Sequence, residues 1–188
     1  SPSVKIIANF AVGYGNIDTT AARERNIVVT NTPEVLDDST ADVSILLLLG
    51  ASRKVLEARR AAELQNWKWS ADFMLGKQMS NKRLGILGMG RIGRAVAKRA
   101  RGFNMEIHYH NRNQLSKNLE EGAIYHKTIK DLFSCSDFLS INCPATKETN
   151  KIINKETLAF LPDNVVIGNA ARGDVVDDEA MIAALKTK

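Results

Sequence analysis

The order of apolar and polar positions along the chain predicts strands that alternate with helices. An unbroken apolar run at residues 84–87 is typical of a strand buried on both faces of a parallel sheet. A helical spacing follows at residues 92–101, and a second strand pattern follows at residues 106–109. Further strand patterns occupy residues 137–142 and 165–167. This alternation predicts an α/β fold with a Rossmann-type, doubly wound parallel sheet.

Weaker patterns predict shorter elements around these. We expect strands at 4–8, 27–30 and 124–125, and helices at 19–25, 117–123, 128–134, 155–160 and 178–188. Residues suited to N-capping precede four of the helices, namely Asp18 (or Thr19), Thr128, Asn154 and Asp177. A long helix is predicted from Ser39 or Thr40 toward Leu64, with Asp37 and Asp38 placed favourably at its N-terminus. Its apolar run at residues 45–50 is too short to span a bilayer and predicts a buried helix.

Three glycines follow the first buried strand in the spacing G-x-G-x-x-G. Gly88 would permit a tight turn, Gly90 would let the backbone approach a pyrophosphate, and Gly93 would let the helix pack against the strand. The free N–H groups at the start of that helix form an anion site. This spacing alone is weak evidence, but a strand before it and a helix after it make a dinucleotide fold the better interpretation.

Composition and net charge limit the classes of function that this chain could have. The 188 residues carry a net charge of +5, with basic residues scattered along the chain, which favours a solvated surface and an anionic cofactor over nucleic-acid binding. There is no signal peptide pattern and no transmembrane pattern. Cys135 and Cys143 lack the spacing of metal ligands, so we predict no metal site and two reduced core thiols of a cytoplasmic protein.

The end of the second strand predicts which cofactor is bound. An acidic residue there would bind the ribose 2′-OH of NAD, whereas an Arg accommodates the 2′-phosphate of NADP. This chain has Asn111 and Arg112 at that point and no Asp or Glu. We therefore predict that NADP(H) is preferred over NAD(H). The alternative is that Arg112 is only a solvated surface charge.

Arg172 is the strongest single candidate for a catalytic residue. It lies on a small-residue loop after a predicted strand, where a guanidinium could hold a carboxylate and polarise a carbonyl. A structural salt bridge with Asp174 or Asp177 explains it equally well at this stage. Gly13 and Gly15, in the loop at residues 9–18, are on local evidence better explained by turn chemistry than by anion binding.

Aromatic residues in the irregular segment 66–80 indicate an interface. Trp67, Trp69, Phe73 and Met74 would lie on a loop, where such side chains often contact another chain. Packing back on their own domain is nearly as good an explanation. We favour a homodimer formed through the cofactor domain.

Four motifs together resemble those of the D-isomer-specific 2-hydroxyacid dehydrogenases. They are Asn-Phe-Ala-Val-Gly-Tyr-Gly-Asn-Ile-Asp from Asn9, Asn-Thr-Pro from Asn31, Leu-Gly-Ile-Leu-Gly-Met-Gly-Arg-Ile-Gly from Leu84, and Asn-Ala-Ala-Arg-Gly-Asp-Val-Val-Asp from Asn169. The sequence Tyr-His-Asn-Arg at residues 109–112 is similar to the glyoxylate/hydroxypyruvate reductase branch. The resemblance covers essentially the whole chain.

The resemblance implies an oxidoreductase that transfers hydride between NADP(H) and a small 2-keto or 2-hydroxy acid, such as glyoxylate or hydroxypyruvate. It implies that amides of Val12 and Gly13 bind the substrate carboxylate, and that Arg172 binds substrate and polarises its keto group. It also implies cofactor contacts from the glycine-rich turn (Gly88, Gly90, Arg91, Ile92, Gly93), the second strand end (Asn111, Arg112), and two later loops (Cys143, Pro144, Ala170, Ala171).

The resemblance also implies groups that this chain does not supply. The family's acid/base His and its orienting Glu follow the helix at which this sequence ends, and His108, His110 and His126 do not match that position. Gly15 stands where many members have Asp. We expect residues 1–35 to be a remnant of a flavodoxin-like substrate domain and residues 36–188 to be an NAD(P)-binding domain truncated at its C-terminal end.

Such a chain would bind cofactor but turn over little or no substrate. The alternative function is a dinucleotide-sensing binding protein that resembles the family's corepressor members.

Overall fold

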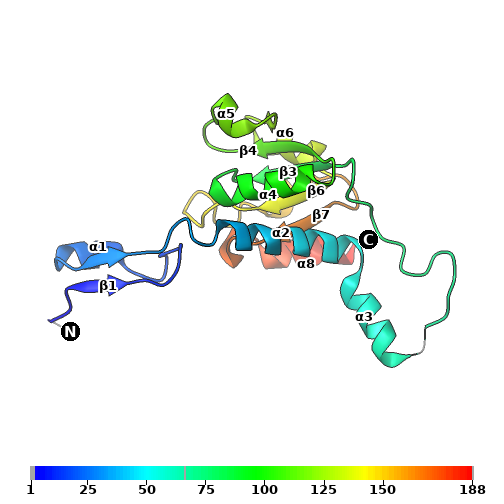
Figure 1. The fold of residues 1–188 in the computed structure, drawn as a ribbon, viewed down its shortest axis with the longest axis horizontal. Helices are drawn as coiled ribbons and strands as arrows, with labels where there is room; N and C mark the ends of the chain where they lie inside the picture. Colours follow the sequence, from blue (N-terminus) through cyan, green and yellow to red (C-terminus); the bar gives the residue numbers. More distant parts are fainter. Residues whose placement is uncertain (1–2, 66, 188) are drawn as a thin grey trace.

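The computed structural model describes residues 3–65 and 67–187, so the predictions that fall on Ser1, Pro2, Asn66 and Lys188 lie outside the described residues. A central α/β body carries a small N-terminal lobe (residues 3–30) at one end and an arm (residues 53–78) at the other (Figure 1). The strands are β1 (Ile6–Ala8), β2 (Val28–Thr30), β3 (Arg83–Leu87), β4 (Glu106–His110), β5 (Ile124–Tyr125), β6 (Phe138–Ile141) and β7 (Val166–Asn169). The helices are α1 (Thr19–Glu24), α2 (Asp37–Ser52), α3 (Val55–Leu64), α4 (Arg91–Arg101), α5 (Lys117–Glu120), α6 (Ile129–Cys135), α7 (Lys155–Leu158) and α8 (Asp178–Lys186), with a 3₁₀ turn, η1, at Gly173–Val175.

The body is built on a five-stranded sheet with the order β5-β4-β3-β6-β7, and every pairing is parallel. Leu84 in the central strand lies opposite Ile107 of β4 and Phe138 of β6. The chain moves outward from β3 in one direction through β4 and β5, and in the other through β6 and β7. The prediction of a doubly wound parallel sheet is therefore confirmed, and the order reverses between β3 and β6, where open α/β sheets bind ligands.

Helices cover both faces of this sheet. On one face, Leu84 and Ile86 of β3 pack with Leu48 of α2 and Val96 of α4 in a buried apolar cluster. On the other face, Leu139 and Ile141 of β6 join a second cluster with Leu132 and Phe133 of α6. The strict alternation of these side chains places the core on both sides of β3 and β6.

All four predicted N-caps are confirmed. Asp18, Thr128, Asn154 and Asp177 each accept a hydrogen bond from a backbone N–H group in the first turn of the helix that follows. At Asn154 the contact is reciprocal, because Thr157 also bonds back to the Asn154 backbone.

The predicted long helix is wrong in its extent, because the chain forms two helices there. The first, α2, begins at Asp37 and ends at Ser52, and α3 begins at Val55 after Lys54 adopts a positive φ of 53°. The Ser52 carbonyl would accept the next helical hydrogen bond, but it accepts one from the Lys77 amide at 2.8 Å instead. The returning segment of the arm, at Lys77, thus ends α2. Beyond that point the chain leaves the core, because no residue of α3 is buried.

The apolar run at residues 45–50 lies on α2 and is buried on one side only. Leu48 is fully buried, whereas Leu46 is 65% exposed and Leu47 is 41% exposed. The expectation of a buried helix is therefore half right. No helix in residues 3–65 or 67–187 combines the length and apolar character needed to cross a membrane.

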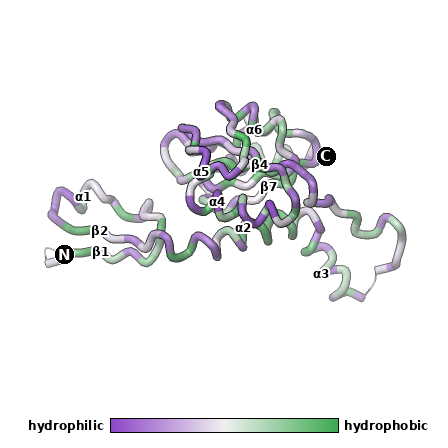
Figure 2. Tube along the Cα trace, turned by 45° about the horizontal axis from the view of Figure 1, so that its top comes forward, coloured by the Kyte–Doolittle hydropathy of each residue, from purple (hydrophilic) through white to green (hydrophobic). Residues whose placement is uncertain are grey.

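The N-terminal lobe is small and open. Its strands β1 and β2 pair in parallel as a sheet of two strands, with α1 as the crossover between them. Ile6 and Val28, which lie side by side in this pair, are both 57% exposed. Figure 2 shows that this lobe projects away from the body, with green apolar positions along its strands.

A partly buried ion pair joins the entry points of the two central strands. Arg83 opens β3 and donates from Nε and Nη2 to the carboxylate of Asp137 at 3.0 and 3.1 Å, and its backbone N–H donates to the same carboxylate. Lys77 Nζ donates to the Asp137 carbonyl at 3.0 Å. The hydrogen bonds from Arg83 lower the pKa of Asp137 to about 2 from an ordinary 3.8.

Replacing this carboxylate should destabilise the body in a pH-dependent way. Asp137→Asn should lower the free energy of unfolding by about 1–2 kcal/mol at neutral pH, because the folded state favours the charged carboxylate. The difference from wild type should shrink as the pH falls from about 4 toward about 2, where Asp137 itself becomes protonated. Urea unfolding at several pH values measures this. Glu63→Gln, which removes the exposed Arg59–Glu63 pair, is the matched control and should change stability by less than about 0.5 kcal/mol.

Candidate functional site

The glycine-rich turn forms where the carboxyl ends of β3 and β6 meet. Gly88 has a φ of +93°, and a Cβ placed on it would lie 2.5 Å from the amide nitrogen of Cys143 and 2.7 Å from its Cα. A Cβ on Gly93 would lie 2.5 Å from the Gly88 carbonyl oxygen. No L side chain fits either position, so both glycines are required by the turn itself.

Gly90 differs from its two neighbours, because a Cβ there would meet nothing within 4 Å. It is the N-cap residue of α4, and no side chain caps that helix among the described residues. The first N–H groups of α4, including those of Arg91 and Ile92, therefore have no side-chain acceptor among the described residues, and they lie at the positive end of the helix dipole. This arrangement can hold a phosphate group. The Arg91 side chain reaches back to form an ion pair with Glu34.

Asn111, which follows β4, reaches across to the same turn. Its Oδ1 accepts a hydrogen bond from the Met89 amide at 2.7 Å, and its Nδ2 lies 3.4 Å from the Met89 carbonyl oxygen. Met89 sits between Gly88 and Gly90, so Asn111 holds the turn in place. The Asn111 side chain, which is predicted to help select the cofactor, is thus engaged with the backbone of the glycine-rich turn.

Arg112 is exposed beside Asn111. The pKa of Glu148 is lowered chiefly by a hydrogen bond from Thr146 and, as a smaller effect, by the positive charge of Arg112. Arg112 forms no ion pair in the part of the chain that the structure describes. Its guanidinium is consequently available to an anion, with Glu148 as the nearby acidic group.

Two buried groups line the end of β6. The Cys143 side chain is 6% exposed, and burial raises the pKa of its thiol, so it stays uncharged. Asn142 donates from Nδ2 to the Ser140 hydroxyl at 2.9 Å, whereas its Oδ1 is buried without a hydrogen-bond partner among the described residues. A buried acceptor left unpaired costs free energy, which is typical of a site completed by a ligand. Pro144 follows and is exposed.

The loop that carries Val12 and Gly13 is held by its carbonyl groups. Asn9 Nδ2 donates to the Gly13 carbonyl at 2.9 Å, and Asn31 Nδ2 donates to the Val12 carbonyl at 2.9 Å. The Thr32 amide donates to the Ala11 carbonyl at 3.0 Å. With the carbonyls engaged, the amide groups of Val12 and Gly13 have no acceptor within the described residues and can bind an anion.

Arg172 reaches this loop from the end of β7. Its Nη1 donates to the Ala171 carbonyl at 2.8 Å, and a Cβ on Gly13 would lie only 2.0 Å from Arg172 Nη2. Asn169 braces the loop from below, because its Oδ1 accepts from the Ala171 amide and its Nδ2 donates to the Arg172 carbonyl, both at 2.9 Å. The structure therefore brings together two predicted substrate-binding positions that are far apart in the sequence.

The salt bridge considered for Arg172 does not form in the described residues. Asp177 caps α8 and pairs with Lys151 at 3.3 Å, and Asp174 forms no ion pair in the described part of the chain. A side chain at Gly13 would displace the Arg172 guanidinium, a contact that local sequence could not reveal.

Histidine is absent from this edge of the sheet. His108 and His110 lie on β4 and His126 follows β5, whereas Arg172 follows β7 at the other end of the strand order. These are all the histidines of the sequence. Arg172 thus offers a cation at this end of the sheet, and no imidazole accompanies it there.

The predicted aromatic segment lies on the arm. The rings of Trp67 and Phe73 stack with centroids 5.5 Å apart, and Trp69 is 81% exposed. Leu56 on α3 is 68% exposed. Trp67 and Phe73 thus contact each other, whereas Trp69 and Leu56 leave apolar surface of the arm uncovered.

The sequence patterns did not identify the asparagines that fix the conformation of these loops. Asn9, Asn31 and Asn169 engage loop carbonyls and amides, and Asn142 presents an unpaired acceptor. Asparagine next to glycine or small residues is a signal for such loop bracing, because its amide can both donate and accept.

Comparison with known proteins is consistent with this architecture. Residues 45–188 match the family model described as "D-isomer specific 2-hydroxyacid dehydrogenase, NAD binding domain". A glyoxylate reductase of Pyrococcus horikoshii is 43% identical over 191 residues, covering 99% of this chain and 57% of that protein. The chain thus spans little more than half the length of this curated relative.

Two solved structures are also similar. A glyoxylate reductase from Paecilomyes thermophila superposes with a TM-score of 0.90 at 43% identity, covering 99% of this chain and 56% of that one. An NADPH-dependent glyoxylate/hydroxypyruvate reductase from Sinorhizobium meliloti has a TM-score of 0.88 at 35% identity, covering 99% and 57%. With its glycine-rich turn, parallel sheet and family match, the chain belongs to the D-isomer specific 2-hydroxyacid dehydrogenase family and contains that family's NAD-binding domain.

Proposed function

We propose that the protein to which this chain belongs transfers a hydride between NADP(H) and a small 2-keto acid such as glyoxylate or hydroxypyruvate. The observation that carries the proposal is the position of the Arg172 guanidinium directly over Gly13. A cation and free amide groups meet there at the edge of the sheet that also holds the glycine-rich turn. A protein that only senses the dinucleotide has no need of this second anion site, so catalysis is favoured over the corepressor-like alternative.

The residues around the turn fit a dinucleotide. The amides of Arg91 and Ile92 would hold the pyrophosphate, with Gly90 leaving room for it. The unpaired Oδ1 of Asn142 offers a buried acceptor, which suits a donor group of the dinucleotide such as a hydroxyl or an amide rather than the pyrophosphate. Cys143 and Pro144 would border the adenosine half, and the small side chains of Ala170 and Ala171 would admit the nicotinamide. The nicotinamide, when bound, supplies or accepts the hydride.

The chain's own residues would orient the substrate. The amides of Val12 and Gly13 would bind the substrate carboxylate, while Arg172 would bind the substrate and withdraw electron density from its keto oxygen. The bracing of both loops by asparagine side chains fixes these donors before substrate arrives. Such preorganisation is where an enzyme gains most from a fixed charge.

We further propose that this 188-residue chain binds cofactor with little or no turnover. Reduction of a keto group also needs a proton, and no histidine stands near Arg172 to donate it. Residues 1–35 would belong to a substrate domain, and the rest would form the cofactor domain. Rates of glyoxylate reduction by this chain that match those of an intact relative would contradict this view.

The preference for NADP(H) is also a proposal. Asn111 is occupied with Met89, so the exposed Arg112 is the group left to meet the 2′-phosphate, in place of its weak interaction with Glu148. One similar reductase is itself described as NADPH-dependent.

We also propose a cytoplasmic location, since both cysteines are free thiols.

Cofactor titration should separate the two phosphate contacts. We expect NADPH to bind more tightly than NADH by fluorescence titration, and Arg112→Ala to weaken NADPH binding roughly tenfold or more while changing NADH binding little. Gly90→Ala should weaken both cofactors alike, because its methyl group would enter the pyrophosphate site without disturbing the fold. Tighter binding of NADH by the wild-type chain would overturn the proposed preference.

Two glycines of one loop provide a matched test of the substrate site. In the presence of saturating NADP⁺, Gly13→Ala should weaken glyoxylate binding by about tenfold or more, because its Cβ would displace the Arg172 guanidinium. Gly15→Ala should bind as wild type, since a Cβ there meets nothing within 4 Å. Isothermal titration calorimetry measures both. Equal effects of the two substitutions would argue against a site between this loop and Arg172.

We propose that the uncovered apolar side chains of the arm lie in the interface of a homodimer formed through the cofactor domain. Trp69 and Leu56 are more exposed than aromatic and leucine side chains usually are, and such surfaces mark interfaces between chains.

Removing these two side chains should dissociate the dimer. We expect the wild-type chain to have a dimer's mass by light scattering, and Trp69→Ser combined with Leu56→Ser to have a monomer's mass. Leu119→Ser on α5, which removes a 39% exposed leucine elsewhere, should leave the dimer intact. A wild-type chain that is monomeric at high concentration would refute the dimer.

A further inference from the structure

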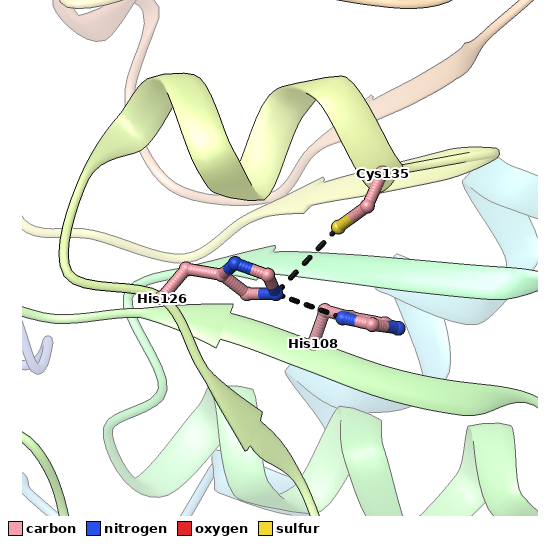
Figure 3. Close-up of side chains that lie close together, drawn as sticks. All are labelled: His108, His126 and Cys135. Carbon is pink, nitrogen blue, oxygen red and sulfur yellow. Dashed lines mark hydrogen bonds between the residues drawn. The ribbon is translucent and has the colours of Figure 1, made fainter.

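Three metal-ligating side chains converge at the edge of the sheet remote from Arg172. His108 comes from β4, His126 from the residue after β5, and Cys135 from the last turn of α6 (Figure 3). One ligand atom from each lies within 4.8 Å of the other two. Their spacing along the sequence does not reveal this cluster, because it is the sheet that brings a strand, a loop and a helix together.

Two of the three distances within the cluster are close to those of a tetrahedral zinc site. Sγ of Cys135 lies 3.6 Å from Nε2 of His126, and Nδ1 of His108 lies 2.8 Å from the same nitrogen. Zinc bonds of about 2.0–2.1 Å to nitrogen and about 2.3 Å to sulfur place N and S about 3.6 Å apart, and two N atoms about 3.3 Å apart. The two imidazoles would have to separate by about half an ångström, and Cys135 Sγ and His108 Nδ1, which lie within 4.8 Å of each other, would have to come to about 3.6 Å.

A carboxylate stands behind the cluster in the position that metal-binding histidines use. Nε2 of His108 lies 3.1 Å from Glu106 Oε1, near enough for an ion pair but not aligned for a hydrogen bond, so this buried nitrogen has no hydrogen-bond partner among the described residues. If Nδ1 bound a metal, Nε2 would carry the proton and a small ring rotation would direct it to Glu106. His110 Nδ1 donates to the His126 carbonyl at 2.9 Å and holds the second ligand's backbone.

The protonation states of the three side chains have opposite effects on metal binding. Burial lowers the pKa of both His108 and His126, so their imidazoles are neutral and offer lone pairs. Burial raises the pKa of Cys135, so a metal would have to displace the thiol proton. The titratable groups that face the cluster are Glu106, Asp131, Asp137, Arg83 and His110, and Arg83 is already paired with Asp137.

We propose that His108, His126 and Cys135 form a Zn²⁺ site with three protein ligands and a water molecule in the fourth position. Imidazole and thiolate together select zinc over magnesium or calcium. His126 and Cys135 are partly exposed, which gives the ion a way in from solvent. A bound ion would clamp β4, the end of β5 and α6 together. The site would stabilise the edge of the cofactor domain without taking part in hydride transfer.

Metal titration of the whole chain tests the proposal. After treatment with a chelator, the chain should bind one Zn²⁺ with a Kd of about 1 µM or tighter by calorimetry. Co²⁺ should give the near-ultraviolet absorption band of a cobalt–thiolate bond. Cys135→Ser should abolish that band and weaken Zn²⁺ binding by about 100-fold or more, whereas Cys143→Ser, the matched control, should retain both. Glu106→Gln should weaken binding about 10- to 100-fold with the stoichiometry unchanged.

A second readout needs no variant. Zn²⁺ should protect Cys135 from alkylation by iodoacetamide, with the modified cysteine identified by mass spectrometry. The proposal is overturned if Zn²⁺ fails to protect Cys135, if Cys135→Ser binds Zn²⁺ as tightly as wild type, or if binding does not saturate at one ion per chain. In those cases the three side chains form a hydrogen-bonded cluster only.

Discussion

The close approach of β3 and β6 at their carboxyl ends is the constraint from which the rest of the site follows. The Gly88 backbone lies against that of Cys143 with no room for a side chain, and Gly93 lies against the Gly88 carbonyl in the same way. These two contacts bring the start of α4 to the point where the strand order reverses. The first amides of that helix, which no side chain caps among the described residues, consequently lie where the two halves of the sheet meet.

Asparagine side chains bond the backbone carbonyls of both loops that meet at Gly13 and Arg172. A loop that presents amide groups to an anion must satisfy its carbonyls elsewhere. Asn9 and Asn31 do this for the loop at Val12–Gly13, and Asn169 does it for the loop that carries Arg172. The loops are therefore shaped by the protein before any ligand is bound, and Arg172 is held over Gly13 by short-range contacts within its own loop.

The sequence predicts those features of the fold that local chemistry decides. The helix N-caps, the glycine-rich turn and the doubly wound sheet depend on short patterns, and each is confirmed. The end of α2 could not be predicted, because the Ser52 carbonyl is taken by Lys77 on a returning segment. The same holds for the contact of Gly13 with Arg172 and for the convergence of His108 with Cys135, since each depends on how distant segments pack. Residue spacing reveals which residues are neighbours along the chain, but not which residues become neighbours across a sheet.

Asn111 links two tasks that are usually treated as separate. The residue at the tip of β4 is the natural place to engineer a switch of cofactor, yet here its amide group also braces the Met89 backbone inside the phosphate-binding turn. An aspartate at this position could still accept from the Met89 N–H but could not donate to its carbonyl. If Asn111 and Arg112 meet the cofactor as we propose, cofactor specificity and the shape of the glycine-rich turn are coupled through Asn111. A change of cofactor preference is then more readily made at Arg112, which forms no hydrogen bond to that turn among the described residues.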